Sequence, residues 1–206
     1  MTDDCCPDAC TPGVPPTDRY RRILVIALVL NVLMFGVELV ASWWSGSVSL
    51  LADSIDFFGD AVNYGVSLAV LSMAVVWRSK AAMAKGIAMF SFGVFVLARA
   101  GWGIVAGDTP EPLTMGVTAV MAFAVNMGVA WMLYAFREGD ANMRSVWLCS
   151  RNDAISNIAV MVAALAVLLS GTRWPDLIVA LVMGGLALTS GTSVMRQAGG
   201  ELKNSV

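Results

Sequence analysis

The segment that decides the fold reads Ser45-Gly-Ser-Val-Ser-Leu-Leu-Ala-Asp-Ser-Ile-Asp-Phe-Phe-Gly-Asp60. It carries three carboxylates, Asp53, Asp56 and Asp60, and continues through Asn63 into an apolar run. An α-helix turns by about 100° per residue, so these four polar side chains fall within an arc of roughly 80°. An aspartate at the centre of a membrane-spanning helix costs about 3 kcal/mol to insert, and such residues usually face a polar cavity on an ion path. The alternative is an amphipathic helix of a soluble protein, with its acidic stripe facing water.

Composition favours the membrane interpretation. The 206 residues are 58% hydrophobic and 14% charged, and the mean hydropathy is +0.73. These values are typical of a polytopic membrane protein, and the length allows about six spans. The chain contains no histidine, so a metal site has to use carboxylate, thiolate, amide or backbone ligands. Nothing in the sequence indicates binding to nucleic acid.

The sequence predicts an all-α membrane protein that folds as a six-transmembrane-helix bundle. The expected spans are about 23–44, 48–77, a third from after Lys85 to Val105, then 113–136, 146–169 and 176–195. Arg173 is the one basic residue near the span ends on one side of the membrane. The other side has ten: Arg19, Arg21, Arg22, Arg78, Lys80, Lys85, Arg137, Arg144, Arg196 and Lys203. By the positive-inside rule, both termini are expected to be cytoplasmic, with the protein in the lipid bilayer of the cell (inner) membrane.

The expected organisation is one transmembrane domain at 19–198 between two cytoplasmic tails, at 1–18 and 199–206. The first tail has no apolar run, so we do not expect a signal peptide there. Its three cysteines, Cys5, Cys6 and Cys10, could capture a thiophilic cation through two or three thiolates. The alternative is a mobile tail whose cysteines have no dedicated role.

A second polar insertion lies in the fifth expected span. Cys149, Asp153 and Asn157 follow one another at four-residue spacing, so they share one helix face, as Asp56 and Asp60 do. Two facing helices that each present two ligand atoms one turn apart can close a four-coordinate site, which is the preference of Zn²⁺. The alternative for Cys149 is a small buried hydrophobic residue without a ligand role.

Together, the two polar segments resemble the cation diffusion facilitator family. In that family the second helix carries Ser-Gly-Ser-x-(Ser/Ala)-Leu-Leu-Ala-Asp followed by a His/Asp-x-x-x-Asp metal pair, and residues 38–60 match this pattern. Residues 142–157, with Trp174-Pro-Asp176, are similar to the family's fifth helix and its link to the sixth. The resemblance covers about residues 20–198, and it implies that the transport ligands are Asp56, Asp60, Cys149 and Asp153. It also implies exchange of a divalent cation for protons, export from the cytoplasm and a homodimer.

This chain departs from the family pattern at three points. Cys149 stands where the family usually has His or Asp, and neither the family's cytoplasmic C-terminal domain nor its histidine-rich loop has a counterpart in the sequence. One thiolate among oxygen ligands favours softer ions, so we expect Zn²⁺ and Cd²⁺ rather than Mn²⁺, Mg²⁺ or Ca²⁺, with Hg²⁺ as a further candidate. Supporting or pathway roles are expected for four further residues: Asp53, Asn63, Asn157 and Glu38.

The function expected from the sequence is proton-coupled efflux of Zn²⁺ or Cd²⁺ from the cytoplasm across the inner membrane. The protein is therefore expected to be a secondary transporter and not an enzyme, with the metal as cargo and without a prosthetic group. Two alternatives stay open at this point. One is a membrane metal sensor or metal-binding partner protein that does not transport, and the other is a carrier of organic cations.

Overall fold

A computed structural model describes residues 18–69, 75–107, 109–136 and 141–204. These residues form six α-helices and one 3-10 turn, and no strand occurs among them. The elements are α1 (Asp18–Ser45), α2 (Val48–Ala69), α3 (Val75–Ala106), α4 (Pro112–Leu133), η1 (Tyr134–Phe136), α5 (Ala141–Ser170) and α6 (Trp174–Asn204). The predicted all-α fold with six long helices is confirmed.

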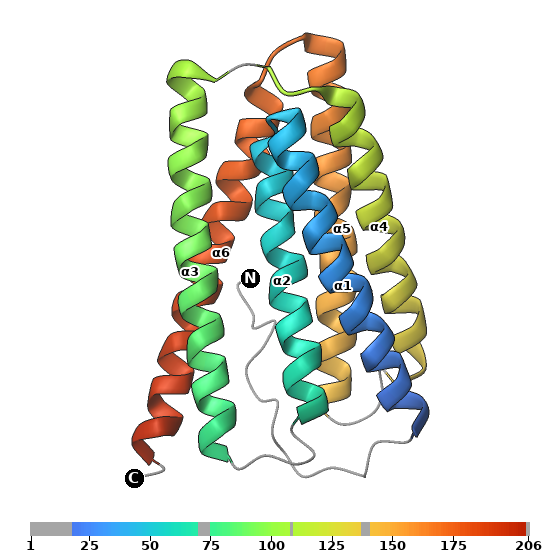
Figure 1. Cartoon of the computed structure of the whole chain (residues 1–206), viewed down its shortest axis with the longest axis vertical. Helices are drawn as coiled ribbons and strands as arrows, with labels where there is room; N and C mark the ends of the chain where they lie inside the picture. Colours follow the sequence, from blue (N-terminus) through green and yellow to red (C-terminus); the bar gives the residue numbers. More distant parts are fainter. Residues whose placement is uncertain (1–17, 70–74, 108, 137–140, 205–206) are drawn as a thin grey trace.

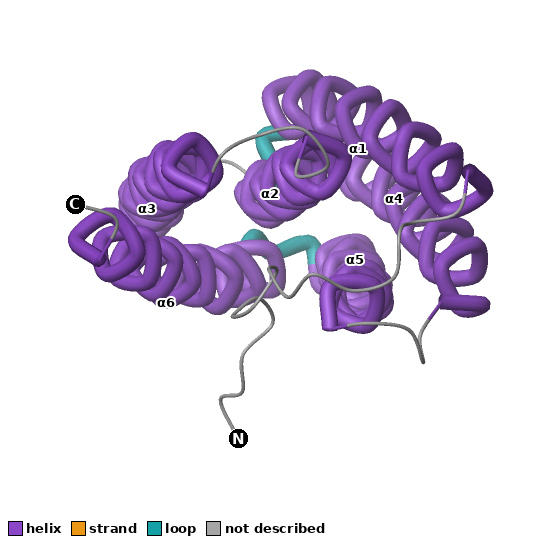
Figure 2. The backbone as a smooth tube through the Cα atoms, turned by 90° about the horizontal axis from the view of Figure 1, so that it is seen from below, coloured by secondary structure: helices purple, strands orange, loops and turns teal. Residues whose placement is uncertain are grey.

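Five of the described helices, all except α2, contain a segment long and apolar enough to cross a membrane. The exception, α2, carries Asp53, Asp56 and Asp60 within its 22 residues. A helix with three carboxylates is costly to place in lipid, so it needs polar or protein surroundings on that face. The bundle supplies them, because α2 contacts α1, α3, α5 and α6 and lies at the centre of the molecule (Figure 2).

Successive helices run in opposite directions (Figure 1). The α1–α2, α3–α4 and α5–α6 connections lie at one end of the bundle, which we call the connection end, whereas α1 starts and α6 finishes at the opposite end. A chain that crosses a membrane six times requires helices that alternate in direction and termini on the same side. Two of these connections turn at a glycine in the left-handed region, Gly46 (φ 71°) and Gly171 (φ 63°), where other residues are strained.

The helices pack as three pairs, one of which contains α2. Contacts are most extensive between α3 and α6, between α1 and α2, and between α4 and α5. Glycines allow the α3–α6 pair to approach closely: a Cβ atom on Gly191 would lie 2.8 Å from the Phe90 amide nitrogen and 3.0 Å from the Gly86 carbonyl oxygen. Such backbone proximity at glycine is a common way for membrane helices to pack.

The predicted boundary between the second and third helices is wrong. The second span was expected to continue to Trp77, but α2 is described to Ala69 and Trp77 belongs to α3, which begins at Val75. The reason is that α3 extends beyond its apolar segment, Gly86–Val105. Arg78, Lys80 and Lys85 lie in this extension and favour helix. At the other end of the chain, α6 continues to Asn204, past the expected end of the sixth span at 195.

The predicted N-terminal tail lies outside the described residues, except for Asp18. Cys5, Cys6 and Cys10 therefore remain a prediction from the sequence alone.

Candidate metal centre

The acidic face of α2 is enclosed within the bundle. Asp53 is 1% exposed and Asp60 is 5% exposed, while Asp56 is half-buried. Glu38 on α1 is a fourth carboxylate of this region. It is fully buried and interacts with Asp53 and Asp56. The stripe predicted from helical spacing therefore faces the protein interior.

Asp153 brings the second predicted half to this face. It is half-buried on α5 and interacts with both Asp60 and Asp56. Two carboxylates from α2 and one from α5 are thus close enough to interact electrostatically. The helices α2 and α5 are also in direct contact.

A hydrogen-bonded chain of hydroxyl groups reaches Asp60 from α5. The Tyr64 hydroxyl donates to Asp60 Oδ2 at 3.1 Å and lies 2.6 Å from Ser150 Oγ. Because a phenol has a single hydrogen, Ser150 is the donor in the second bond. Neither residue is among those predicted from the sequence; Tyr64 is one turn after Asp60, and Ser150 is one turn before Asp153.

Several buried polar atoms have no hydrogen-bond partner among the described residues. They include both carboxylate oxygens of Glu38, Oδ2 of Asp53, and both side-chain atoms of Asn157. Buried polar groups are normally paired, so the unpaired oxygens of Glu38 and Asp53 are chemically suited to a cation, a proton or water. Asn63, the remaining supporting residue predicted, is half-buried on α2.

The fourth predicted ligand, Cys149, lies in α5, but its side chain is outside the described part of the structure. Within that part, no three carboxylate, thiol or imidazole groups gather closely enough to hold a metal ion. The set Asp56, Asp60, Cys149 and Asp153 therefore stays a prediction.

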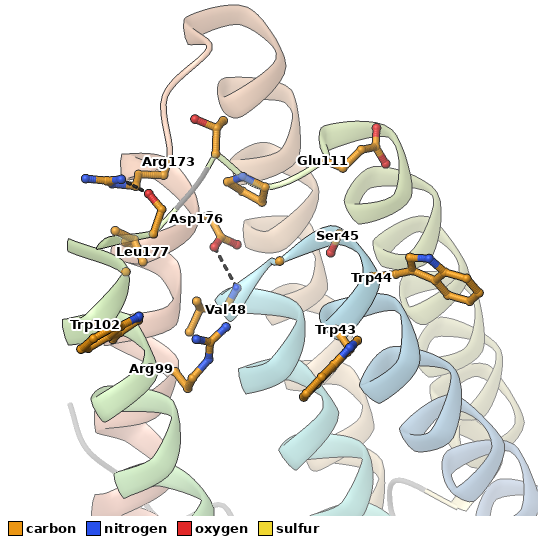
Figure 3. Close-up of a pocket in the computed structure, with 15 residues that line it drawn as sticks. Trp43, Trp44, Ser45, Val48, Arg99, Trp102, Glu111, Arg173, Asp176 and Leu177 are labelled. Carbon is orange, nitrogen blue, oxygen red and sulfur yellow. Dashed lines mark hydrogen bonds between the residues drawn. The ribbon is translucent and has the colours of Figure 1, made fainter. Parts of the chain in front are cut away.

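Asp176 ties the beginning of α6 to the beginning of α2 (Figure 3). Its carboxylate is 1% exposed and accepts bonds from the Ser47 hydroxyl at 2.6 Å, the Val48 N–H at 2.9 Å, and the Ser49 N–H and hydroxyl at 3.1 and 2.7 Å. Asp176 thus caps α2 at its N-terminus, a position where negative charge is stabilising. This contact fixes the connection end of the helix that carries the acidic stripe.

Residues 24–202 match the model of a protein family described as the cation efflux transmembrane domain. The chain belongs to the cation efflux family. The sequence resemblance is thereby confirmed, and the chain is a multi-pass membrane protein.

The chain is also similar to curated bacterial proteins. It is 22% identical over 194 residues to a cadmium, cobalt and zinc/H(+)-K(+) antiporter of Bacillus velezensis, covering 86% of this chain and 61% of the relative. It is 23% identical over 176 residues to the metal cation efflux system protein CzcD of Cupriavidus metallidurans, covering 80% and 56%. The zinc transporter ZitB of Escherichia coli is 25% identical over 203 residues, covering 91% and 64%. The chain therefore spans about three fifths of the length of these relatives.

The match to the cation efflux family contains both halves of the candidate centre. Glu38, the stripe on α2 and the polar insertion of α5 all lie between residues 24 and 202. Cys5, Cys6 and Cys10 lie before it.

Proposed function

We propose that this protein exports Zn²⁺ or Cd²⁺ from the cytoplasm across the inner membrane in exchange for protons. The observation that carries the proposal is the electrostatic interaction of Asp153 on α5 with Asp60 and Asp56 on α2, two helices that are in contact inside a membrane bundle. Membership of the cation efflux family and the names of the relatives support this choice of cargo.

The chemistry of exchange follows from the crowding of acids. Ionised carboxylates that lie close together in a low-dielectric interior repel one another, so the cluster is stable only when it holds protons or a cation. Binding of a divalent cation therefore releases protons, and protonation weakens the binding of the metal. We propose Asp56, Asp60, Cys149 and Asp153 as ligands, with Glu38, Asp53, Asn63 and Asn157 as supporting or pathway groups.

Transport requires the site to open alternately to each side. We propose that metal enters from the cytoplasmic side, that the helices rock, and that protons from outside displace the metal. The excess of basic residues near one set of span ends supports an orientation with both termini in the cytoplasm. We also propose a homodimer, which rests on the family resemblance alone.

The test is metal uptake by purified protein in liposomes with an acidic lumen. A metal-sensitive dye in the lumen should report accumulation of Zn²⁺ and Cd²⁺ that depends on the pH gradient. Asp60→Ala and Asp153→Ala should abolish accumulation, while Asp18→Ala, an exposed carboxylate at the start of α1, should retain it. Binding of metal without flux would favour a metal sensor. Flux of organic cations that is unaffected by chelators would favour a carrier of organic cations.

A further inference from the structure

A cavity of about 520 Å³ opens at the connection end of the bundle. It lies between the end of α1, the last turns of α3, and the segments that lead into α4 and α6 (Figure 3). Its charged lining residues are Arg99, Glu111, Arg173 and Asp176. None of the proposed metal ligands lines it, so this cavity is separate from the candidate metal centre.

Both acidic groups of the cavity are already engaged. The Glu111 carboxylate accepts bonds from the N–H groups of Leu113 at 2.9 Å and Thr114 at 2.6 Å. Asp176 accepts its bonds from the start of α2, as described above. These carboxylates therefore stabilise helix ends and are not free to pair with an arginine.

One of the two arginines is also engaged. Arg173 donates to the carbonyl oxygens of Gly107 and Ile104, which fastens the α5–α6 connection to the end of α3. The guanidinium of Arg99, in contrast, makes no hydrogen bond or ion pair with the described residues, and it extends from α3 toward the start of α2 (Figure 3). The cavity thus contains a cation without a partner in the described structure.

The position of Arg99 along α3, below the end of the helix, limits which anions can reach its guanidinium. Arg99 lies in the apolar segment Gly86–Val105, seven residues before the end of α3, which corresponds to about 10 Å along the helix. An unpaired charge at that depth is costly, and a long basic side chain reduces the cost by extending to the headgroup layer. A phosphate there matches the planar guanidinium fork, which binds phosphate through two parallel hydrogen bonds.

Three tryptophans place this cavity at the membrane surface. Trp43, Trp44 and Trp102 line it and are 91%, 82% and 64% exposed. Exposed indoles at the end of spanning helices are typical of the boundary between lipid tails and headgroups. Lipid headgroups, rather than solutes of the bulk phase, are therefore the most concentrated source of phosphate beside Arg99.

We propose that this cavity binds the phosphate of an anionic phospholipid headgroup, with Arg99 as its main ligand and the three tryptophans around it. An anionic lipid is favoured over a zwitterionic lipid because its phosphate is not already neutralised by an ammonium group of the same headgroup. This proposal concerns lipid binding and does not depend on the proposed transport function.

The test is lipid binding by the full-length protein, followed by native mass spectrometry during titration with phosphatidylglycerol or phosphatidylcholine. The protein should bind phosphatidylglycerol more tightly than phosphatidylcholine, and Arg99→Gln should reduce the affinity for phosphatidylglycerol about tenfold or more. Arg196→Gln is the matched control, because Arg196 is exposed and lies in the second half of α6, a helix that starts beside the cavity and finishes at the opposite end of the bundle. Arg99→Lys, which keeps the charge and loses the fork, should give an intermediate loss and provides the test if Arg99→Gln does not fold.

Three results would overturn the proposal. One is equal affinity for the two lipids, and another is an equal loss in Arg99→Gln and Arg196→Gln. The third concerns free anions: inorganic phosphate that stabilises the lipid-free protein in an Arg99-dependent way, and that displaces the lipid, would assign the cavity to a soluble anion. No effect of inorganic phosphate, together with Arg99-dependent binding of phosphatidylglycerol, supports the lipid site.

Discussion

Tyr64 sets the orientation of one carboxylate in the candidate metal centre. Its hydroxyl accepts from Ser150 on α5 and donates to Asp60 on α2. A hydroxyl group that donates to one oxygen of a carboxylate fixes the orientation of the other oxygen, which remains available for a metal. Groups around metal ligands usually have this role.

We therefore expect Tyr64→Phe to weaken metal binding while the fold is retained. The affinity for Zn²⁺ should fall about 10- to 100-fold, because the variant removes the bond to Asp60 and keeps the ring. Isothermal titration calorimetry of the purified protein would measure the change. Tyr134→Phe, at an exposed position in η1, is the control, and equal affinities in the two variants would show that the Tyr64 hydroxyl does not support the site.

In the proposed site, Cys149 is the ligand that we expect to set the preference among metals. In Cys149→Asp, the only soft ligand of the proposed set is replaced by a hard oxygen ligand, so the preference for Cd²⁺ over Zn²⁺ should fall. Competition between the two ions during uptake into liposomes would measure this preference. If the ratio of the two rates is the same in Cys149→Asp and in the native protein, Cys149 is not a ligand.

At the scale of single elements, the first turn of α4 depends on an ionised Glu111. Hydrogen bonds from Thr114, and next from the N–H of Leu113, hold the pKa of the Glu111 carboxyl below its ordinary value. A carboxyl whose pKa is lower in the folded state stabilises the fold above its unfolded pKa of about 4.3, and this contribution is lost as the pH falls through the lower, folded pKa.

Hydrogen exchange at the start of α4 should therefore be slow at pH 6, after correction for the intrinsic rate, and faster below about pH 4. The comparison is Glu111→Gln, in which this part of the pH dependence should disappear. A pH dependence that is the same with glutamate and with glutamine would assign the effect to another group.

The α3–α6 pair depends on the absence of a side chain at Gly191. An added Cβ there would meet backbone atoms of α3 at 2.8 and 3.0 Å, and backbone atoms cannot rotate away. Gly191→Ala should lower the free energy of unfolding by about 1–3 kcal/mol. Gly185→Ala in the same helix is the control, because its Cβ would have no neighbour within 4 Å. Thermal unfolding in detergent would show the difference. Equal melting temperatures of the two variants would mean that the α3–α6 pair accommodates the added methyl group without loss of stability.

For the whole molecule, the sequence is sufficient to predict the number of helices and the position of the acidic stripe. Apolar runs of about 20 residues define spans, and the spacing of Asp53, Asp56 and Asp60 defines one face of a helix. The beginning of α3 at Val75 could not be predicted in this way, because basic residues beyond the membrane continue the helix without an apolar pattern.

Contacts between helices were the other limit. The bond between Tyr64 on α2 and Ser150 on α5 depends on which helix faces meet in three dimensions. Neither the hydroxyl of Tyr64 nor that of Ser150 stands out in a sequence that contains many such groups. Asp153 could be named as a candidate partner of the stripe on α2, because its four-residue spacing from Cys149 repeats the spacing of Asp56 and Asp60.

We propose that one set of buried carboxylates exchanges a metal ion for protons. The most direct measurement follows luminal pH and luminal metal in the same liposomes, with one dye for each and with Zn²⁺ added outside. We predict that metal accumulates only as protons leave the lumen, and that Asp60→Ala abolishes both signals together. Accumulation of Zn²⁺ with an unchanged luminal pH, insensitive to collapse of the pH gradient, would contradict the account.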